Sequence, residues 1–215
     1  MGTPTNAGDG GSAGSARAPG GGADVFRQER IFQRLDQCSP RAYERSHYVR
    51  LAVWMVVSRT LFRFSPRRAH GFRVWLLNRF GAKCHPTVTI RPSAKVRHPW
   101  LLTLDEHASI SDDVNLYNLG PISVGAHSVI SQSAHICAGT HDYTKPDLPL
   151  VRPAVVIGRG VWICAEAFVG PGVTIGDNVI VGARGVVTRS IPAGVIAGGN
   201  PAKVLRERPM PGINC

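Results

Sequence analysis

The sequence predicts an all-β protein, a triangular solenoid of short parallel strands with a helical segment before it and a short extension after it. Three observations predict this fold. Aliphatic residues recur every six positions, the positive charge lies mostly before these repeats, and the 215 residues include 24 glycines and 16 prolines. A composition so rich in turn residues is typical of many tight turns and argues against a bundle of helices.

Residues 1–23 are mostly glycine, serine, alanine and proline. We expect a disordered tail here, because such a composition cannot bury enough apolar surface to fold. The stretch also lacks the apolar core of a secretory signal. Five cysteines without a CxxC pair argue against a disulfide framework or a thiolate zinc site. Together these features predict a cytoplasmic chain with reduced thiols.

Residues 24–83 form the next predicted segment, which is basic and amphipathic. Within it, residues 41–83 hold ten basic side chains and one acidic one, which accounts for most of the formal net charge of +11. Arginines mix with aromatic and aliphatic residues too irregularly for a strand, so the pattern indicates helices broken near Ser65 and Pro66. The longest purely apolar stretch, residues 51–57, is far shorter than the roughly 20 residues of a membrane-spanning helix.

Two readings of this basic segment remain open. In the first, its rings lie in the headgroup layer of an anionic membrane and its arginines near the phosphates, which gives peripheral contact at the inner membrane face through residues 41–83. In the second, its apolar residues pack on the main domain and the arginines are solvated. Nucleic acid is not expected as a partner, because no nucleic-acid-binding motif accompanies the charge.

Residues 84–208 carry the six-residue repeat. A period of six is neither the 3.6 of a helix nor the 2 of a simple strand, so each unit is a short strand plus a turn. Stacking three units per turn makes a triangular parallel β-helix with aliphatic side chains along its axis. We expect residues 209–215 to form a tail. The inward residues are Ile90, Val96 and Leu102; Leu104, Ile110, Leu116 and Ile122; Val124, Ile130 and Ile136; and Ile157, Ile163, Val169, Ile175, Val181 and Val187.

The repeat loses its phase between Ile136 and Ile157, whose separation is not a multiple of six. We therefore expect a loop thrown outward at this point, and it carries the string CAGTHDYTKPDLPL. His141 opens this loop. An imidazole titrates near neutral pH and is suited to general-base catalysis, although a surface histidine bonded to loop backbone would give the same pattern.

A second hypothesis joins His141 with His127 and His135 in a three-histidine zinc site that activates water, as in β-helical carbonic anhydrases. The ligand spacing does not reproduce the short HxxxxH pair of such sites, so no metal is expected. Cys137 and Cys164 follow inward aliphatic residues. A cysteine paired with His141 is conceivable as a nucleophile, but small turn residues are the simpler interpretation.

The segment from Ala154 to Arg208 resembles the C-terminal half of the hexapeptide acyltransferases, and its ending GNPAKV is typical of the branch that acetylates sugars and related hydroxyl compounds. The earlier strings GAKCHPTVTIRPSAKV, LYNLGPISVG and AGTHDYTKPDLPL resemble the colanic acid biosynthesis acetyltransferases. The likeness runs from about Ser65 to Arg208. It implies a left-handed β-helix and an acetyl-CoA-dependent O-acetyltransferase, assembled as a homotrimer with active sites between neighbouring subunits.

The resemblance also implies roles for individual residues. The family's catalytic histidine matches His141, which would take the proton from a sugar hydroxyl as that oxygen attacks the thioester. Asp142 and Glu166 are the candidate carboxylates for orienting it. On the substrate side the matching residues are Asn115, Asp142 and Tyr143. Along the acetyl-CoA groove they are Trp162, Ala165, Ala183, Thr188, Arg189, Lys203 and Arg206, of which the three cations suit phosphates.

These features predict an enzyme that acetylates a sugar hydroxyl in exopolysaccharide assembly of the colanic acid type, with a lipid-linked sugar as one candidate acceptor. The same chemistry on a soluble acceptor, such as a free sugar, serine or an antibiotic, is the alternative. Outside that chemistry, a metal-dependent hydratase and a catalytically silent scaffold remain as alternatives.

Overall fold

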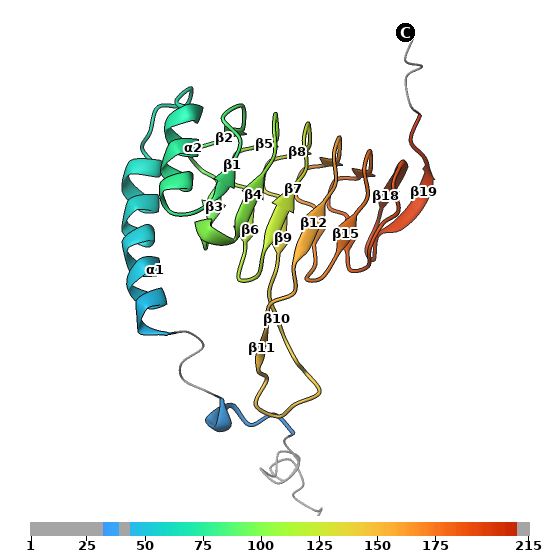
Figure 1. Ribbon diagram of the computed structural model, residues 1–215. Helices are drawn as coiled ribbons and strands as arrows, with labels where there is room; N and C mark the ends of the chain where they lie inside the picture. Colours follow the sequence, from blue (N-terminus) through green and yellow to red (C-terminus); the bar gives the residue numbers. More distant parts are fainter. Residues whose placement is uncertain (1–31, 39–43, 210–215) are drawn as a thin grey trace, which may run out of the picture.

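The computed structural model describes residues 32–38 and 44–209. It shows a left-handed parallel β-helix with a helical segment across one end and a strand folded back at the other (Figure 1). The predicted tails, residues 1–23 and all but the first residue of 209–215, lie outside the described residues. No helix in the described ranges has the length and hydropathy that a bilayer crossing requires.

Three parallel sheets form the sides of the prism, and each coil adds one strand to every sheet. Sheet 1 holds β1 (Lys83–Cys84), β4 (Leu102–Leu104), β7 (Ile122–Val124), β12 (Val155–Ile157) and β15 (Thr174–Ile175). Sheet 2 holds β2 (Thr89–Ile90), β5 (Ser109–Ile110), β8 (Val129–Ile130), β13 (Trp162–Ile163), β16 (Ile180–Val181), β18 (Val195–Gly198) and the antiparallel β19 (Lys203–Glu207). Sheet 3 holds β3 (Lys95–Val96), β6 (Asn115–Tyr117), β9 (His135–Cys137), β14 (Phe168–Val169) and β17 (Val186–Val187).

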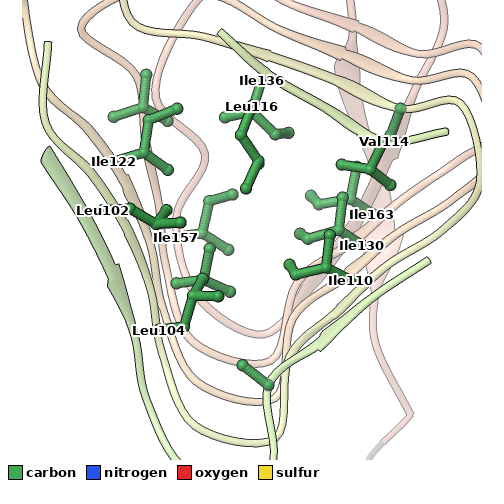
Figure 2. Packing of buried hydrophobic residues seen from close by; sticks show 14 of the residues in the cluster. Leu102, Leu104, Ile110, Val114, Leu116, Ile122, Ile130, Ile136, Ile157 and Ile163 are labelled. Atoms are coloured by element: carbon green, nitrogen blue, oxygen red, sulfur yellow. The ribbon is translucent and has the colours of Figure 1, made fainter. Parts of the chain in front are cut away.

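The core of the prism consists of the aliphatic residues that the repeat predicts to point inward. All sixteen of them, from Ile90 to Val187, are buried and belong to one hydrophobic cluster. Figure 2 shows part of this cluster, with Ile110, Ile130 and Ile163 stacked in one column. The predicted inward positions are therefore confirmed, and burial of this apolar surface is the main force that holds the coils together.

The coils have two lengths, which explains the phase shifts in the repeat. In sheet 3, Lys95 pairs with Asn115 and Asn115 with His135, at intervals of 20 residues, whereas Phe168 pairs with Val186 at an interval of 18. The longer coils have three-residue strands, β4 and β7, with both end residues buried. Because side chains on a strand alternate with a period of two, two added residues keep the inward positions inward.

A helical cap covers the first coil. It contains α1 (Arg45–Val57), the π-helical turn η3 (Ser58–Phe62) and α2 (His70–Arg79), and two short 3-10 turns, η2 (Leu35–Gln37) and η4 (Pro99–Leu101), lie outside it. Trp54, Phe62 and Leu77 join the hydrophobic cluster, and the indole N–H of Trp54 donates to the carbonyl of Val96 at 2.8 Å. Without the cap, the aliphatic residues of the first coil would face water.

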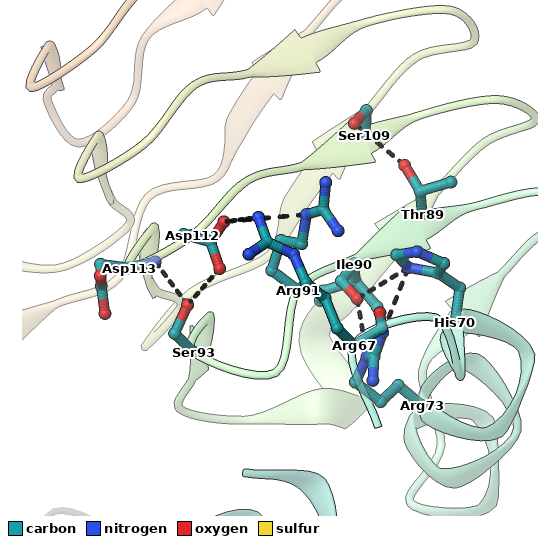
Figure 3. Close-up of polar contacts among 10 residues, drawn as sticks. All are labelled: Arg67, His70, Arg73, Thr89, Ile90, Arg91, Ser93, Ser109, Asp112 and Asp113. Atoms are coloured by element: carbon teal, nitrogen blue, oxygen red, sulfur yellow. Dashed lines mark hydrogen bonds and ion pairs between the residues drawn. The ribbon is translucent and has the colours of Figure 1, made fainter. Parts of the chain in front are cut away.

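The predicted break between the helices is confirmed, and a buried arginine ties it together. Arg73 is fully buried, and its guanidinium donates to the carbonyls of Ile90, Pro66 and Arg67 and to the hydroxyl of Ser65, at 2.7–2.8 Å. Figure 3 shows Arg73 beside Ile90 and Arg67. A buried charge is tolerated when its donors are satisfied in this way. The bonds connect the turn around Pro66, α2 and the first coil.

The helical cap has an inner and an outer side. Its inner side packs on the β-helix, as the second reading predicts. Its outer side leaves seven apolar side chains at least 40% exposed, and this set is called the outer apolar face below. It consists of Val49, Val53, Val56, Leu61, Phe64, Phe72 and Trp75.

Candidate active site

The ejected loop forms a hairpin at the edge where sheet 3 meets sheet 1. It leaves the coil after β9 and rejoins it at β12, and its strands β10 (Thr140–His141) and β11 (Leu150–Val151) pair antiparallel. Figure 1 shows it standing clear of the coils. His135 and Phe168 pair across an interval of 33 residues. A coil has room for only 18 or 20 of them, so the remainder is forced outward.

His141 lies exposed on β10, and a backbone carbonyl orients its imidazole. The Nδ1 atom lies 2.6 Å from the carbonyl oxygen of Leu148. Because a carbonyl oxygen can only accept, Nδ1 carries the hydrogen and donates it. The Nε2 atom then keeps its lone pair toward solvent, which is the form that a general base requires.

The loop that presents the Leu148 carbonyl is stabilised by its own backbone. The Leu148 N–H donates to Lys145 at 3.2 Å, the Lys145 N–H donates to Asp142 at 3.2 Å, and the Asp142 N–H donates to Pro149 at 3.0 Å. Leu148 itself has a left-handed φ of 44°. These contacts fix the carbonyl that sets the tautomer of the histidine.

The described N-terminal segment, residues 32–38, also contacts this loop. The Arg34 N–H donates to the Pro146 carbonyl at 2.7 Å, and the Cys38 thiol donates to the Asp147 carbonyl at 2.8 Å. A segment far away in sequence thus supports the hairpin from outside. Neither contact was foreseen from the sequence, because nothing in a single sequence pairs residues a hundred positions apart.

Both candidate carboxylates have partners other than His141. Asp142 accepts from the backbone N–H of Thr144 at 3.1 Å and from its hydroxyl, and these hydrogen bonds lower the pKa of Asp142. Glu166 accepts from Arg184 at 2.7 Å. The orienting role therefore belongs to the Leu148 carbonyl. Tyr143, two residues after β10, is 82% exposed and accessible to a substrate or a neighbouring chain.

Asn115 lies on sheet 3, in the row of outward residues that leads toward the hairpin. The row runs from Lys95 through Asn115 to His135 on paired strands. The ring of His135 contacts the edges of Tyr117 and Phe168, with centroids 6.1 and 5.4 Å apart. Its Nε2 is buried and has no hydrogen-bond partner among the described residues, and burial lowers the pKa of His135. This part of sheet 3 combines polar and aromatic side chains, a combination that suits the binding of a carbohydrate.

Part of the predicted acetyl-CoA set lies on sheet 2. Trp162 is 46% exposed on β13, and its indole N–H donates to the Ser131 hydroxyl at 2.9 Å. Lys203 and Arg206 lie exposed on β19, which belongs to the same sheet. The structure thus brings an aromatic ring and two cations to one face of the prism. The hairpin leaves from the opposite edge.

The remaining predicted acetyl-CoA residues lie at edges of the prism. Ala165 and Ala183 occupy successive coils at the edge between sheets 2 and 3, where the Arg184 N–H donates to the Ala165 carbonyl at 2.9 Å. Thr188 and Arg189 follow β17, at the same edge as the hairpin. Within one chain the predicted set is therefore divided between the hairpin edge and the faces away from it.

The three histidines of the zinc hypothesis lie apart. His127 stacks on His107, with centroids 4.9 Å apart, while His135 lies between aromatic rings of sheet 3 and His141 stands on the hairpin. In the part of the chain that the structure describes, no three His, Cys, Asp or Glu side chains are grouped closely enough to hold a metal ion. The geometry gives no support to the zinc hypothesis.

Known proteins are similar to this chain in both sequence and fold. Residues 154–189 match the family model described as "Bacterial transferase hexapeptide (six repeats)". Over 169 residues the chain is 46% identical to the "Putative colanic acid biosynthesis acetyltransferase WcaF" of Escherichia coli (strain K12). The aligned region covers 79% of this chain and 93% of the relative. The chain is also 49% identical over 103 residues to the galactoside O-acetyltransferase of the same organism, covering 48% and 45% of the two chains.

Solved structures agree with the fold. The hexapeptide-repeat acetyltransferase VCA0836 of Vibrio cholerae O1 biovar eltor, complexed with acetyl coenzyme A, superposes with a TM-score of 0.71 at 23% identity and covers 85% of this chain and 98% of its own. A galactoside acetyltransferase in complex with coenzyme A gives a TM-score of 0.69 at 21% identity, over 78% and 84% of the two chains. On fold, repeat and sequence together, the chain belongs to the hexapeptide-repeat acyltransferases.

Proposed function

We propose that the chain transfers an acetyl group from acetyl-CoA to a sugar hydroxyl, with His141 as the general base. The observation that carries this proposal is the 2.6 Å contact between His141 Nδ1 and the Leu148 carbonyl, which leaves Nε2 as an exposed acceptor. Relatives named as acetyltransferases, and a structural neighbour that holds acetyl coenzyme A, support the reaction class.

The mechanism follows from that geometry. His141 Nε2 removes the proton from the acceptor hydroxyl while its oxygen attacks the thioester carbonyl carbon. The imidazolium that forms keeps its Nδ1 hydrogen bond to the Leu148 carbonyl, whose partial negative charge stabilises it. When the C–S bond breaks, Nε2–H returns the proton to the departing thiolate. The products are the acetyl ester and free CoA, and His141 is again neutral.

The division of the predicted acetyl-CoA residues supports a homotrimer. Trp162, Lys203 and Arg206 lie on sheet 2, away from the edge that carries His141. A cosubstrate that touches sheet 2 and also brings its thioester to His141 therefore needs the hairpin of a second copy. A heterologous contact of this kind closes into a ring when it is repeated.

The acceptor class rests on the relative WcaF, whose name refers to colanic acid biosynthesis. We therefore place the acceptor among sugars of exopolysaccharide assembly. A free sugar or another soluble hydroxyl compound is the second candidate, favoured by the partial match to a galactoside O-acetyltransferase.

Membrane contact is a further part of the proposal. The outer apolar face lies on a segment that carries ten of the chain's basic side chains and a single acidic one. Apolar rings flanked by arginines fit an anionic bilayer surface. In a vesicle co-sedimentation assay, Phe64→Ser with Trp75→Ser is expected to reduce binding to anionic vesicles several-fold. The matched control, Val204→Ser with Leu205→Ser, changes exposed apolar residues at the other end. Equal binding by all three proteins would refute membrane contact.

The reaction itself is tested by thiol release from acetyl-CoA with a panel of acceptors: nucleotide sugars, free sugars and a membrane lipid extract. We expect turnover with at least one sugar acceptor, and a loss of at least a hundredfold in His141→Ala. His127→Ala, which removes an imidazole from a distant turn, serves as the control. Turnover that survives in His141→Ala would contradict the assignment of the base, and a silent panel would contradict the reaction.

A further inference from the structure

We propose that a cationic pocket beside η3 binds the diphosphate group of a sugar–diphosphate acceptor. This inference rests on the proposed function, because it names the acceptor class for the same site. The pocket has a volume of about 510 Å³ and lies between the helical cap and sheet 3. Sites of this size hold small-molecule ligands. Its cations are Arg59 and Arg63 from the cap side and Lys95 and Arg97 from the first coil.

These four cations have no carboxylate partners among the described residues, where every ion pair involves other side chains. The nearby Asp112 is already occupied, since Arg67 lies 3.3 Å and Arg91 3.8 Å from it (Figure 3). Of the described residues that line the pocket, Asp113 alone is acidic. Four positive charges around one negative charge leave an excess that an anion with two or three charges would balance.

The pocket is built on rigid elements. Its apolar wall includes Trp54 and Phe62, both almost fully buried in the core. The Trp54 indole is anchored to the Val96 carbonyl, and Ser93 is anchored to Asp112 at 3.0 Å. Because Arg59 and Arg63 are four residues apart on consecutive helical turns, they project from the same side. The four cations are exposed to solvent and line one cavity, whose apolar wall is fixed by the core.

The pocket is continuous with the predicted acceptor surface. Asn115 lines it and pairs directly with His135 in the next coil. From β9 the chain runs within three residues into β10, which carries His141. A ligand held by its diphosphate in the pocket would therefore place its sugar along the outward row of sheet 3, from which the chain continues into the hairpin that carries His141.

The chemistry selects a diphosphate, because guanidinium groups bind phosphate oxygens in pairs and with charge assistance. Two sources share this group, a nucleoside diphosphate sugar and a polyprenyl diphosphate sugar. A second groove of about 530 Å³, lined by apolar residues that include Leu61, Phe64 and Phe72, borders the same π-helical turn. It offers a place for an isoprenoid chain, so the experiment compares both sources.

The first test measures binding of inorganic pyrophosphate by calorimetry, with saturating CoA present so that the cosubstrate groove is filled. We expect Arg59→Gln with Arg63→Gln to raise the Kd at least tenfold. The control, Arg68→Gln with Arg79→Gln, removes the same charge from exposed positions of the cap outside the pocket and should change the Kd less than twofold. Failure of the wild type to bind pyrophosphate, or an equal loss in both variants, would overturn the proposal.

The second test compares KM for UDP-glucose, for a short-chain citronellyl diphosphate glucose and for free glucose. In Arg59→Gln with Arg63→Gln, the KM for at least one diphosphate acceptor should rise tenfold relative to that for glucose, with kcat kept, because the contact is remote from the reacting oxygen. Whichever acceptor responds identifies the source. An unchanged ratio for both would refute the acceptor role. Pyrophosphate binding without thiol release from any acceptor would instead refute the proposed function while the diphosphate site stands.

Discussion

In the coil that contains β13, Ile163 is fully buried, and the N–H groups of Trp162 and Cys164 donate to the next coil at 2.8 and 2.9 Å. In the hairpin, by contrast, His141 and Tyr143 are exposed, and the backbone bonds run mainly within the hairpin itself. The coils bury their inward aliphatic side chains, whereas no residue of the hairpin from Thr140 to Val151 is fully buried, so stability and chemistry can be separated by mutation.

The largest effect is expected from shortening the hairpin. Replacing residues 142–149 by Asn-Gly, which suits a two-residue turn between antiparallel strands, removes the Leu148 carbonyl and keeps His141. We expect kcat for acetyl transfer to fall by about 10²–10⁴, the range for a lost general base. The thermal midpoint should move by only a few degrees, because no core residue is lost. Calorimetry and thiol release measure the two quantities, and a collapse of the midpoint would contradict the separation.

The next effect concerns the coils. Ile163→Ala removes a fully buried side chain from the middle of a column and should lower the free energy of unfolding by about 3 kcal/mol. Val129→Ala, on the paired strand but 37% exposed, is the matched control and should cost far less. Urea unfolding at one protein concentration compares them. Equal destabilisation would show that the inward column does not dominate stability.

A third effect depends on pH. His98 is buried, with Nδ1 2.9 Å from the Asn118 carbonyl, and burial lowers the pKa of His98 to about 4. The unfolded chain binds a proton near pH 6.5, where folded His98 stays neutral. Stability is therefore complete above pH 6.5 and declines as the pH falls from 6.5 toward 4, by up to about 3 kcal/mol. A thermal midpoint that is flat between pH 7.5 and 5, or a His98→Gln variant with the same slope, would contradict this.

The smallest effect is expected for Asp142→Asn. Its carboxylate caps the hairpin turn by accepting from Thr144 and does not contact His141. Because an amide oxygen can still accept those bonds, kcat should fall less than fivefold. A loss as large as that of His141→Ala would give the carboxylate a direct part in catalysis.

The same comparison explains how much the sequence could predict. Inward positions follow from a local six-residue period, so the sixteen inward aliphatic residues could be predicted from the sequence. The break in the phase of this period located the hairpin. The need for glycine at particular positions of the repeat could not be predicted, since at Gly176 a Cβ would meet the Ala193 backbone nitrogen at 2.5 Å. Several left-handed turn positions are occupied by residues such as His107 and Glu166.

What the sequence could not give are contacts between distant segments. The orienting group of His141 is a backbone carbonyl seven residues away, which has no signature in residue type, and the candidate carboxylates proved to have other partners. The cationic pocket joins residues of the cap with residues of the first coil. The sequence shows the excess of arginine in the basic segment. That two of these arginines, Arg59 and Arg63, line the same pocket as Asn115 depends on how the cap packs on the β-helix.

The central claim is that His141 acts in chemistry and not in holding the cosubstrate. The most direct test measures the Kd of acetyl-CoA by calorimetry and kcat at saturating acetyl-CoA for the wild type and His141→Ala. We predict Kd values within twofold of each other and a kcat reduced by at least a hundredfold. An unchanged kcat, or a loss explained by weaker acetyl-CoA binding, would contradict the account.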